Sequence, residues 1–279
     1  MERNDWVIES GVLTGHNICS DFIRTNVAIP EGTRVIGEGV FRGDRHIKGV
    51  SIPDSVRSIE EGAFQSCTGL ERIRIPGSVA SIGDFAFEYC ENLSYASIGE
   101  GVRSIGYGAF SNCEKLETIA IPQSVTFVDN SAFSSCKSLT SISIPGSVAC
   151  INEGTFSLCT NLNAVFIGNG VRSIGEDAFE ECSNLEIVLI PNSVTSIGDG
   201  AFRNCEKLRM VEIPNGVRSI GADAFWGCDN LRVVIIPPSV TSIGADAFEY
   251  CENLTLQVFA NSYAEQYVIK NKIPGVYIG

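Results

Sequence analysis

A strictly periodic repeat runs through most of the chain and restricts its fold more than any other feature. Phe recurs ten times at a constant spacing of 23, from Phe41 to Phe248. In every copy after the first, Cys follows the Phe by three positions and Leu follows the Cys by three. A period that holds without insertion from the first Phe to the last predicts a solenoid, in which each repeat forms one coil and equivalent side chains stack.

Each repeat is expected to contain two extended segments joined by turns. After each Leu, an alternating run such as residues 72–75 (RIRI) predicts a strand with one face inside, and Pro usually ends it. The Ser-Val-x-Ser-Ile stretch predicts a second, shorter extended segment. The Gly that follows this Ile in most copies is interpreted as a turn residue with positive φ. The Ala-Phe-x-x-Cys-x-x-Leu stretch is interpreted as a 3₁₀ or helical turn that points Phe, Cys and Leu the same way.

The two ends depart from the repeat and are expected to cap it. We predict one domain over residues 1–279, with an N-terminal β cap at 1–28, ten coils at 29–256 and a helical cap at 257–279. Residues 5–13 are interpreted as a capping strand or hairpin that ends in a turn at residues 14–15. Asn261 or Ser262 suits the N-cap of a closing amphipathic helix. The predicted fold class is therefore a repeat solenoid, mainly β, with short helical turns.

The repeat resembles that of BspA-like leucine-rich repeat proteins. The copy at residues 75–93, IPGSVASIGDFAFEYCENL, and its nine counterparts carry the resemblance, and residues 7–13 and 261–267 resemble the ends of that family. The resemblance implies a curved solenoid with parallel strands. It also implies adhesion to or binding of proteins, including host or extracellular matrix proteins, at a cell surface or after secretion. It implies no catalytic residues and no cofactor.

Charge and hydropathy exclude several classes of partner. The chain has 33 acidic and 20 basic residues, a formal net charge of −13, which argues against nucleic acid or anionic lipid as the main partner. No apolar run approaches the length that a membrane-spanning helix needs, so we expect no membrane insertion. Residues 1–11 lack the apolar segment of a secretory signal. A native chain of this length would then be cytoplasmic, whereas a trimmed mature form would not; the sequence leaves both open.

Nine of the 11 cysteines fall in one column, which allows three interpretations. They are small apolar side chains inside the coils, or a ladder of disulfides, or metal ligands. Parallel side chains in register point alongside one another, which disfavours disulfides, and a straight column spreads its ligands too far for one metal ion. We therefore expect buried thiols. Cys19 and Cys150 lie outside the column, either as replacements of Ser or as exposed thiols.

The sequence offers little material for catalysis. His16 and His46 are the only histidines, and no nucleophile elbow or phosphate-binding glycine motif accompanies them. Acidic pairs such as Glu60-Glu61 are expected on a solvated face rather than across a cleft. We predict no catalytic, cofactor or metal site and a non-enzymatic protein.

The outward face of the main strands carries the strongest functional signal. If the two Ile of each strand point inward, the residues before them point outward, and in the last four coils these outward residues are mostly large and apolar. The residues predicted to bind a partner are Phe166, Ile187, Leu189, Met210, Val233 and Ile235. A patch of this kind suits a partner protein or self-association. Two other interpretations remain open: the closing helix or a loop covers these residues, or the register is shifted by one and they are core.

A second column holds Arg in five of the coils, in most of them directly after the repeated Val: Arg34, Arg57, Arg103, Arg172 and Arg218. It is interpreted either as a solvated spacer or as a contact for an acidic partner. Three functions compete at this point: an interaction module, a structural or self-assembling element, and an enzyme. We favour the first, because a rigid stack presents a surface whose binding orders few groups.

Overall fold

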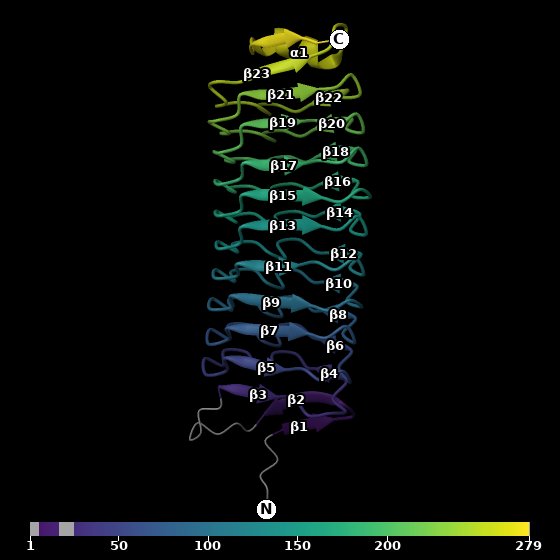
Figure 1. The fold of residues 1–279 in the computed structure, drawn as a ribbon, viewed down its shortest axis with the longest axis vertical. Coiled ribbons are helices and arrows are strands. Elements are labelled where there is room, and N and C mark those ends of the chain that lie inside the picture. Colours follow the sequence, from purple (N-terminus) through teal and green to yellow (C-terminus); the bar gives the residue numbers. More distant parts are fainter. Residues whose placement is uncertain (1–5, 17–24, 279) are drawn as a thin grey trace, which may run out of the picture. The chain divides into compact units, whose positions relative to one another are not determined.

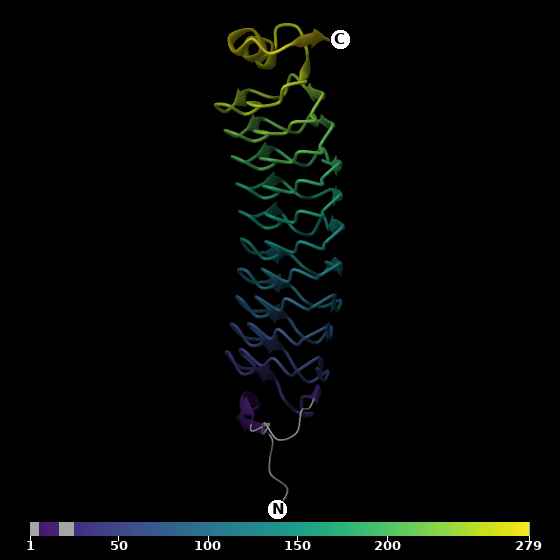
Figure 2. The same cartoon turned by 90° about the vertical axis from the view of Figure 1, so that its left-hand side faces the viewer.

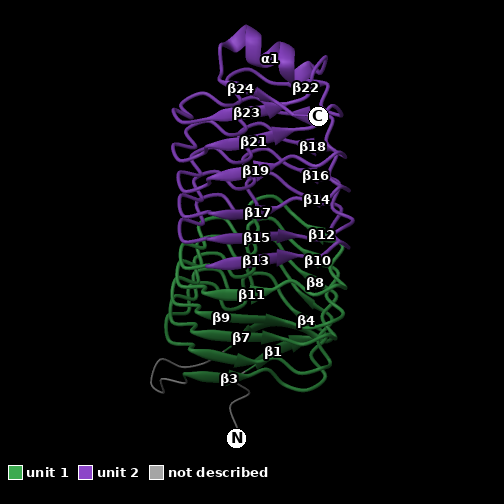
Figure 3. Cartoon of the chain, turned by 45° about the horizontal axis from the view of Figure 1, so that its top comes forward, with its two compact units in different colours: residues 1–139 green, residues 140–279 purple. Residues whose placement is uncertain are grey.

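The computed structural model describes residues 6–16 and 25–278. It confirms the predicted repeat solenoid, with about 11 turns and one short helix near the end of the described chain. The chain divides into two compact units, Met1–Leu139 and Thr140–Gly279 (Figure 3). Within each unit, successive coils lie one above the next (Figures 1 and 2). The domain boundaries predicted above, including a single domain over 1–279, stay predictions.

Unit 1 consists of two parallel sheets, preceded by an antiparallel hairpin. The hairpin joins β1 (Trp6–Glu9) to β2 (Val12–His16), and β2 continues in parallel with the short strands. The sheet of long strands comprises β3 (Asn26–Ala28), β5 (Gly49–Ser51), β7 (Arg72–Ile75), β9 (Tyr95–Ile98) and β11 (Thr118–Ala120). The sheet of short strands adds β4 (Val35–Ile36), β6 (Ser58–Ile59), β8 (Ser81–Ile82), β10 (Ser104–Ile105) and β12 (Phe127–Val128).

The hairpin confirms the expected N-terminal β cap but moves its turn. The turn is at Ser10 and Gly11, which both have positive φ, as a two-residue hairpin loop requires. Thr14 and Gly15, where the turn was predicted, lie within β2. The apolar pattern of β2 continues the column of the later coils, since Leu13 pairs with Ile36, and this explains why the strand extends past Thr14.

Unit 2 repeats the alternation of long and short strands, but its long strands form two sheets. The first consists of β13 (Ser141–Ile144), β15 (Ala164–Ile167) and β17 (Ile187–Leu189), and the second runs from β19 (Met210–Glu212) through β21 (Val233–Ile236) and β23 (Thr255–Val258) to β24 (Gly275–Tyr277). Its short strands are β14 (Cys150–Ile151), β16 (Ser173–Ile174), β18 (Ser196–Ile197), β20 (Ser219–Ile220) and β22 (Ser242–Ile243). Neighbouring strands pair in parallel with equivalent positions of successive repeats side by side, so Val165 lies beside Val188 and Ile174 beside Ile197.

The C-terminal cap is a helix followed by one more strand. Helix α1 (Tyr263–Asn271) begins after Ser262, whose Oγ accepts a hydrogen bond from the Glu265 amide at 3.1 Å. This capping confirms the predicted helix start. Ala264 and Val268 are buried, and Val268 closes the end of the core. The strand β24 (Gly275–Tyr277), which pairs with β23, was not anticipated because it lies beyond the repeat.

The segment around each Phe is not the helical turn that the sequence predicted. The amides of Glu88 and Cys90 donate to carbonyls three residues earlier, as a 3₁₀ turn would require. The amides that alternate with these donate instead to the next coil, Phe87 to Ala109 at 2.8 Å and Tyr89 to Ser111 at 3.0 Å. Phe85 and Tyr89 have positive φ, which breaks any helix. Successive backbone amides in this segment therefore donate alternately within their own coil and to the next coil.

The glycines after the conserved Ile are required for a different reason than the one predicted. Gly83 and Gly175, for example, do not have positive φ; the positive values fall two residues later, at Phe85 and Asp177. A Cβ on Gly83 would lie 2.7 Å from the carbonyl carbon of Glu60, and one on Gly175 would lie 2.7 Å from the carbonyl oxygen of Ile151. Close approach between coils, not turn conformation, therefore selects Gly here.

Stacked side chains fill the core between the sheets. In unit 1 the rings from Phe41 to Phe133 stack with centroids 4.9–5.5 Å apart and planes within 9°. In unit 2 the rings from Phe156 to Phe248 stack at 5.2–5.5 Å. Most of these rings are completely buried, together with the Leu, Val and Ile columns. Each coil therefore completes its core only through its neighbours.

Removing one ring from this stack tests that arrangement. Phe110→Ala should lower the free energy of unfolding by about 3–5 kcal/mol, because it leaves a cavity between two stacked rings. Tyr107→Ala, which removes an exposed ring from the same coil, is the control and should cost less than about 1 kcal/mol. Urea unfolding followed by circular dichroism measures both. Equal losses would show that the stack is not a special source of stability.

Candidate functional site

Large apolar side chains are exposed on the long-strand sheets of unit 2. Phe166 is 44%, Ile187 47%, Leu189 57% and Met210 52% exposed, while Val233 and Ile235 are half-buried. All six side chains predicted to bind a partner thus reach the surface. We call them the apolar patch.

The apolar patch forms two rows across neighbouring strands. Because equivalent positions recur once per coil, Ile187, Met210 and Val233 share one row, and Met210 pairs directly with Val233. Phe166 and Leu189 pair in the other row. Glu212 lies in this second row and separates Leu189 from Ile235, with which it pairs. The apolar surface is therefore continuous over the first row and interrupted in the second.

The alternatives left open by the sequence are resolved by burial. Val165, Val188, Val211 and Val234 are all buried, so a register shifted by one residue is wrong. Neither α1 nor any other described segment covers the apolar patch, since its residues remain accessible with those segments in place. One outward position differs from expectation: Ala164 is buried, because its short side chain lies beside Ile187 on the next strand.

The cysteine column lies in the core. None of the cysteines in the described ranges is joined in a disulfide. Several of the thiols donate to the carbonyl of the Phe one coil back, for example Cys90 to Phe64 and Cys205 to Phe179, both at 3.2 Å. Burial raises the pKa of the Cys67 thiol to about 12, and it raises the pKa of Cys113 well above the ordinary value. Thiols held protonated in this way are poor nucleophiles and poor metal ligands.

The remaining candidates for chemistry are dispersed. His16 stacks on Phe41 with centroids 5.0 Å apart, and His46 is exposed beside Asp44, whose carboxylate accepts the His46 amide. Cys150 is exposed, and the prediction for Cys19 lies outside the described residues. In the parts of the chain that the structure describes, His, Cys, Asp and Glu do not gather in groups of three or more that could hold a metal ion.

A feature that the sequence interpretation missed lies in unit 1. A hollow of about 750 Å³ opens on the outward face of its long-strand sheet, beside Arg72, Arg74 and Tyr95. The signal was present, since Gly49 and Ser51 precede the two arginines at the same strand positions. Small residues next to large ones produce a depression, but the alternation pattern alone does not show it.

The sequence model of one protein family, described as "BspA type Leucine rich repeat region (6 copies)", matches residues 15–140 and 128–255 of this chain. The chain belongs to this family. No curated protein sequence matches it significantly. Among the described residues, no helix has the length and apolarity needed to cross a membrane.

Solved leucine-rich repeat structures share the fold. One from Bacteroides ovatus has 24% identity and a TM-score of 0.51, covering 98% of this chain and 97% of its own. The T. pallidum leucine-rich repeat protein has 25% identity and a TM-score of 0.57, covering 73% and 86%. One from Eubacterium ventriosum has 22% identity and a TM-score of 0.55, covering 86% and 90%. Leucine-rich repeat proteins are generally non-enzymatic and generally bind other proteins.

Thiol reactivity should reflect these environments. In a Cys19→Ser variant at pH 8, a thiol-specific disulfide reagent should react rapidly with Cys150 and slowly with half-buried Cys251. The buried column should react only on unfolding, because a pKa near 12 leaves about one thiolate in ten thousand. Absorbance stopped-flow measures the rates. Rapid reaction of several thiols in the folded protein would contradict the assigned burial. Fewer reactive thiols after unfolding than the sequence contains would indicate disulfides.

Proposed function

We propose that this leucine-rich repeat chain is a non-enzymatic protein-binding module whose partner docks on the apolar patch. The observation that carries the proposal is the exposure of four large apolar side chains on three successive long strands, β15, β17 and β19. Exposed apolar side chains gathered on neighbouring strands are typical of interaction surfaces. Adhesion to a host or extracellular matrix protein at a cell surface is the form of binding that the family resemblance suggests.

The setting of the apolar patch supports a protein partner. Charged residues flank the rows: Glu186 and Arg209 immediately precede Ile187 and Met210, and Glu212 interrupts the second row. An apolar centre with a polar, charged rim is the usual anatomy of a protein interface. Strands β15 and β21 pair with a strand on each side, β17 and β19 pair on one side, and each of the four carries a buried Val that fixes it to the core. The surface is therefore pre-organised, which lowers the entropy lost on binding.

Charge placed in the apolar patch should abolish this binding while leaving the fold intact. Ile187→Glu with Leu189→Glu points two carboxylates outward, so the melting temperature should change little, but capture of matrix proteins should fall at least roughly tenfold. Immobilised full-length chain is incubated with a soluble extracellular matrix extract, and bound protein is quantified by mass spectrometry. The matched control is Thr118→Glu with Ala120→Glu, which adds the same charges at the equivalent positions of β11 in unit 1.

Each result of this experiment bears on the proposal. Capture by the native chain and the control, but not by the patch variant, supports it. Equal capture by all three would place binding elsewhere, and no capture above a blank matrix would contradict matrix adhesion. Sedimentation velocity over a range of concentrations tests self-association: an oligomer that the patch variant loses would make the apolar patch a contact between copies instead.

A further inference from the structure

The hollow in unit 1 has a chemical character opposite to that of the apolar patch. The outward residues of β3 and β5 that line it are Asn26, Ala28, Gly49 and Ser51, and the last three make a floor of small residues. Arg72 and Arg74 stand at its edge on β7, and Tyr95 on β9 lies directly beside Arg72 in the register. Tyr95 is 48% exposed, so its ring is available for contact.

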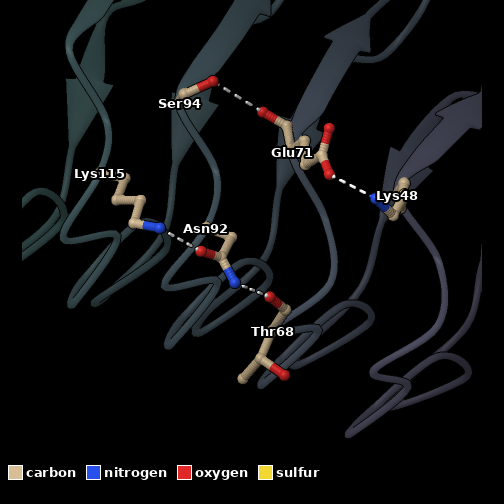
Figure 4. A network of polar contacts seen from close by, with 6 residues as sticks. All are labelled: Lys48, Thr68, Glu71, Asn92, Ser94 and Lys115. Atoms are coloured by element: carbon tan, nitrogen blue, oxygen red, sulfur yellow. Dashed lines mark hydrogen bonds and ion pairs between the residues drawn. The ribbon is translucent and has the colours of Figure 1, made fainter.

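The two arginines have no acidic partner within the described residues. Neither guanidinium forms an ion pair or side-chain hydrogen bond there, although the chain carries a net charge of −13. The carboxylate nearest in sequence, that of Glu71, pairs with a different cation. Its Oε1 lies 2.9 Å from Nζ of Lys48 on the preceding coil (Figure 4). Other cations are paired in the same way, such as Lys137 with Glu114 at 2.7 Å.

The spacing of the pair is fixed by the strand. Residues two apart on a strand point to the same face and lie about 6.5–7 Å apart. Arg72 and Arg74 both point outward because Ile73 and Ile75 are buried. Two guanidinium groups at this spacing match two carboxylates at alternate positions of an extended peptide, and guanidinium binds carboxylate with charge-assisted, two-point hydrogen bonds.

Two further charges limit what can occupy the hollow. Glu31 and Asp54 also line it, after the carboxyl ends of β3 and β5. A uniformly anionic chain, such as a sulfated glycan or a nucleic acid, would meet these carboxylates as well as the arginines. A peptide can present acidic residues to Arg72 and Arg74 and a basic residue to Glu31 and Asp54. The mixed lining therefore favours a peptide.

We propose that this hollow binds an extended peptide segment with two acidic residues at alternate positions, followed by a basic residue. The two carboxylates contact Arg72 and Arg74, the floor of small residues admits the peptide backbone, and the ring of Tyr95 packs against it. This binding site is independent of the apolar patch, because different residues of a different unit form it.

A peptide series tests the proposal directly. Fluorescein-labelled peptides of glycine, serine and threonine carry two aspartates separated by one, two, three or four positions, each followed by a lysine. Fluorescence anisotropy with the full chain should show the strongest binding for aspartates two positions apart. Arg72→Ser with Arg74→Ser should weaken that binding at least roughly tenfold. Added salt should weaken it in the native chain, because the charges are exposed to solvent.

Matched variants separate this site from general charge effects. Serine at both positions is compatible with the fold, since Ser141 and Ser143 stand at the equivalent positions of β13. Arg103→Thr with Arg172→Thr removes the same charge from exposed positions where other coils carry threonine, and it should change the affinity less than roughly twofold. The variant with Glu at positions 187 and 189 should bind the peptide normally, which keeps this test separate from the proposed function.

Three outcomes would overturn the proposal. These are equal binding of all spacings, unchanged binding by the serine variant, and equal weakening by both arginine variants. A heparin oligosaccharide is measured in parallel. If it binds through Arg72 and Arg74 and the peptides do not, the hollow is a polyanion site rather than a peptide site.

Discussion

Every coil of this protein depends on contacts with the coils beside it. The Phe rings stack about 5 Å apart, and alternate backbone donors around each Phe bond to the following coil. A coil on its own would leave its ring half-covered and several amides without partners. Stability therefore comes from the interfaces between neighbouring coils. The hairpin β1–β2 and the helix α1 cover the coils that have a neighbour on one side only.

This division of labour leaves the outward positions free to differ. The inward columns keep the same residue types in both units, whereas the outward faces of the long strands change from coil to coil. In unit 2 they carry Ile187, Leu189 and Met210; in unit 1 they carry Gly49 and Ser51 beside two arginines. Binding chemistry can vary there at little cost in stability, because no core contact depends on it. Function is therefore expected on these faces rather than among the buried cysteines.

The sequence period was sufficient to predict most of the fold. Constant spacing of Phe predicted the stack, alternation predicted the long strands and their register, and the capping pattern predicted the start of α1. It could not distinguish the two reasons for a conserved glycine. Gly83 avoids a clash with Glu60, whereas positive φ falls on Phe85, a residue that no propensity would assign to it. Strand β24 lies outside the period, so the repeat carried no information on it.

The sequence predicted the apolar patch but not the hollow in unit 1, for a related reason. Exposure of the apolar patch follows from register alone, so the sequence located it, although Glu212 as an interruption emerged only from strand pairing. Arg72 and Arg74 can be read from the sequence. That neither forms an ion pair cannot, because it depends on Glu71 pairing with Lys48 instead. Which side chains pair between coils depends on their three-dimensional positions, and the sequence pattern does not determine it.

The regular backbone bonding between coils also bears on how such a protein can evolve. Because each coil offers its neighbour the same donors and acceptors, tandem duplication or loss of one repeat's coding segment rejoins compatible surfaces. The core would tolerate the change without compensating mutations. Each event would instead insert or delete one row of outward side chains, so a lineage can enlarge, divide or erase a recognition surface in single genetic steps.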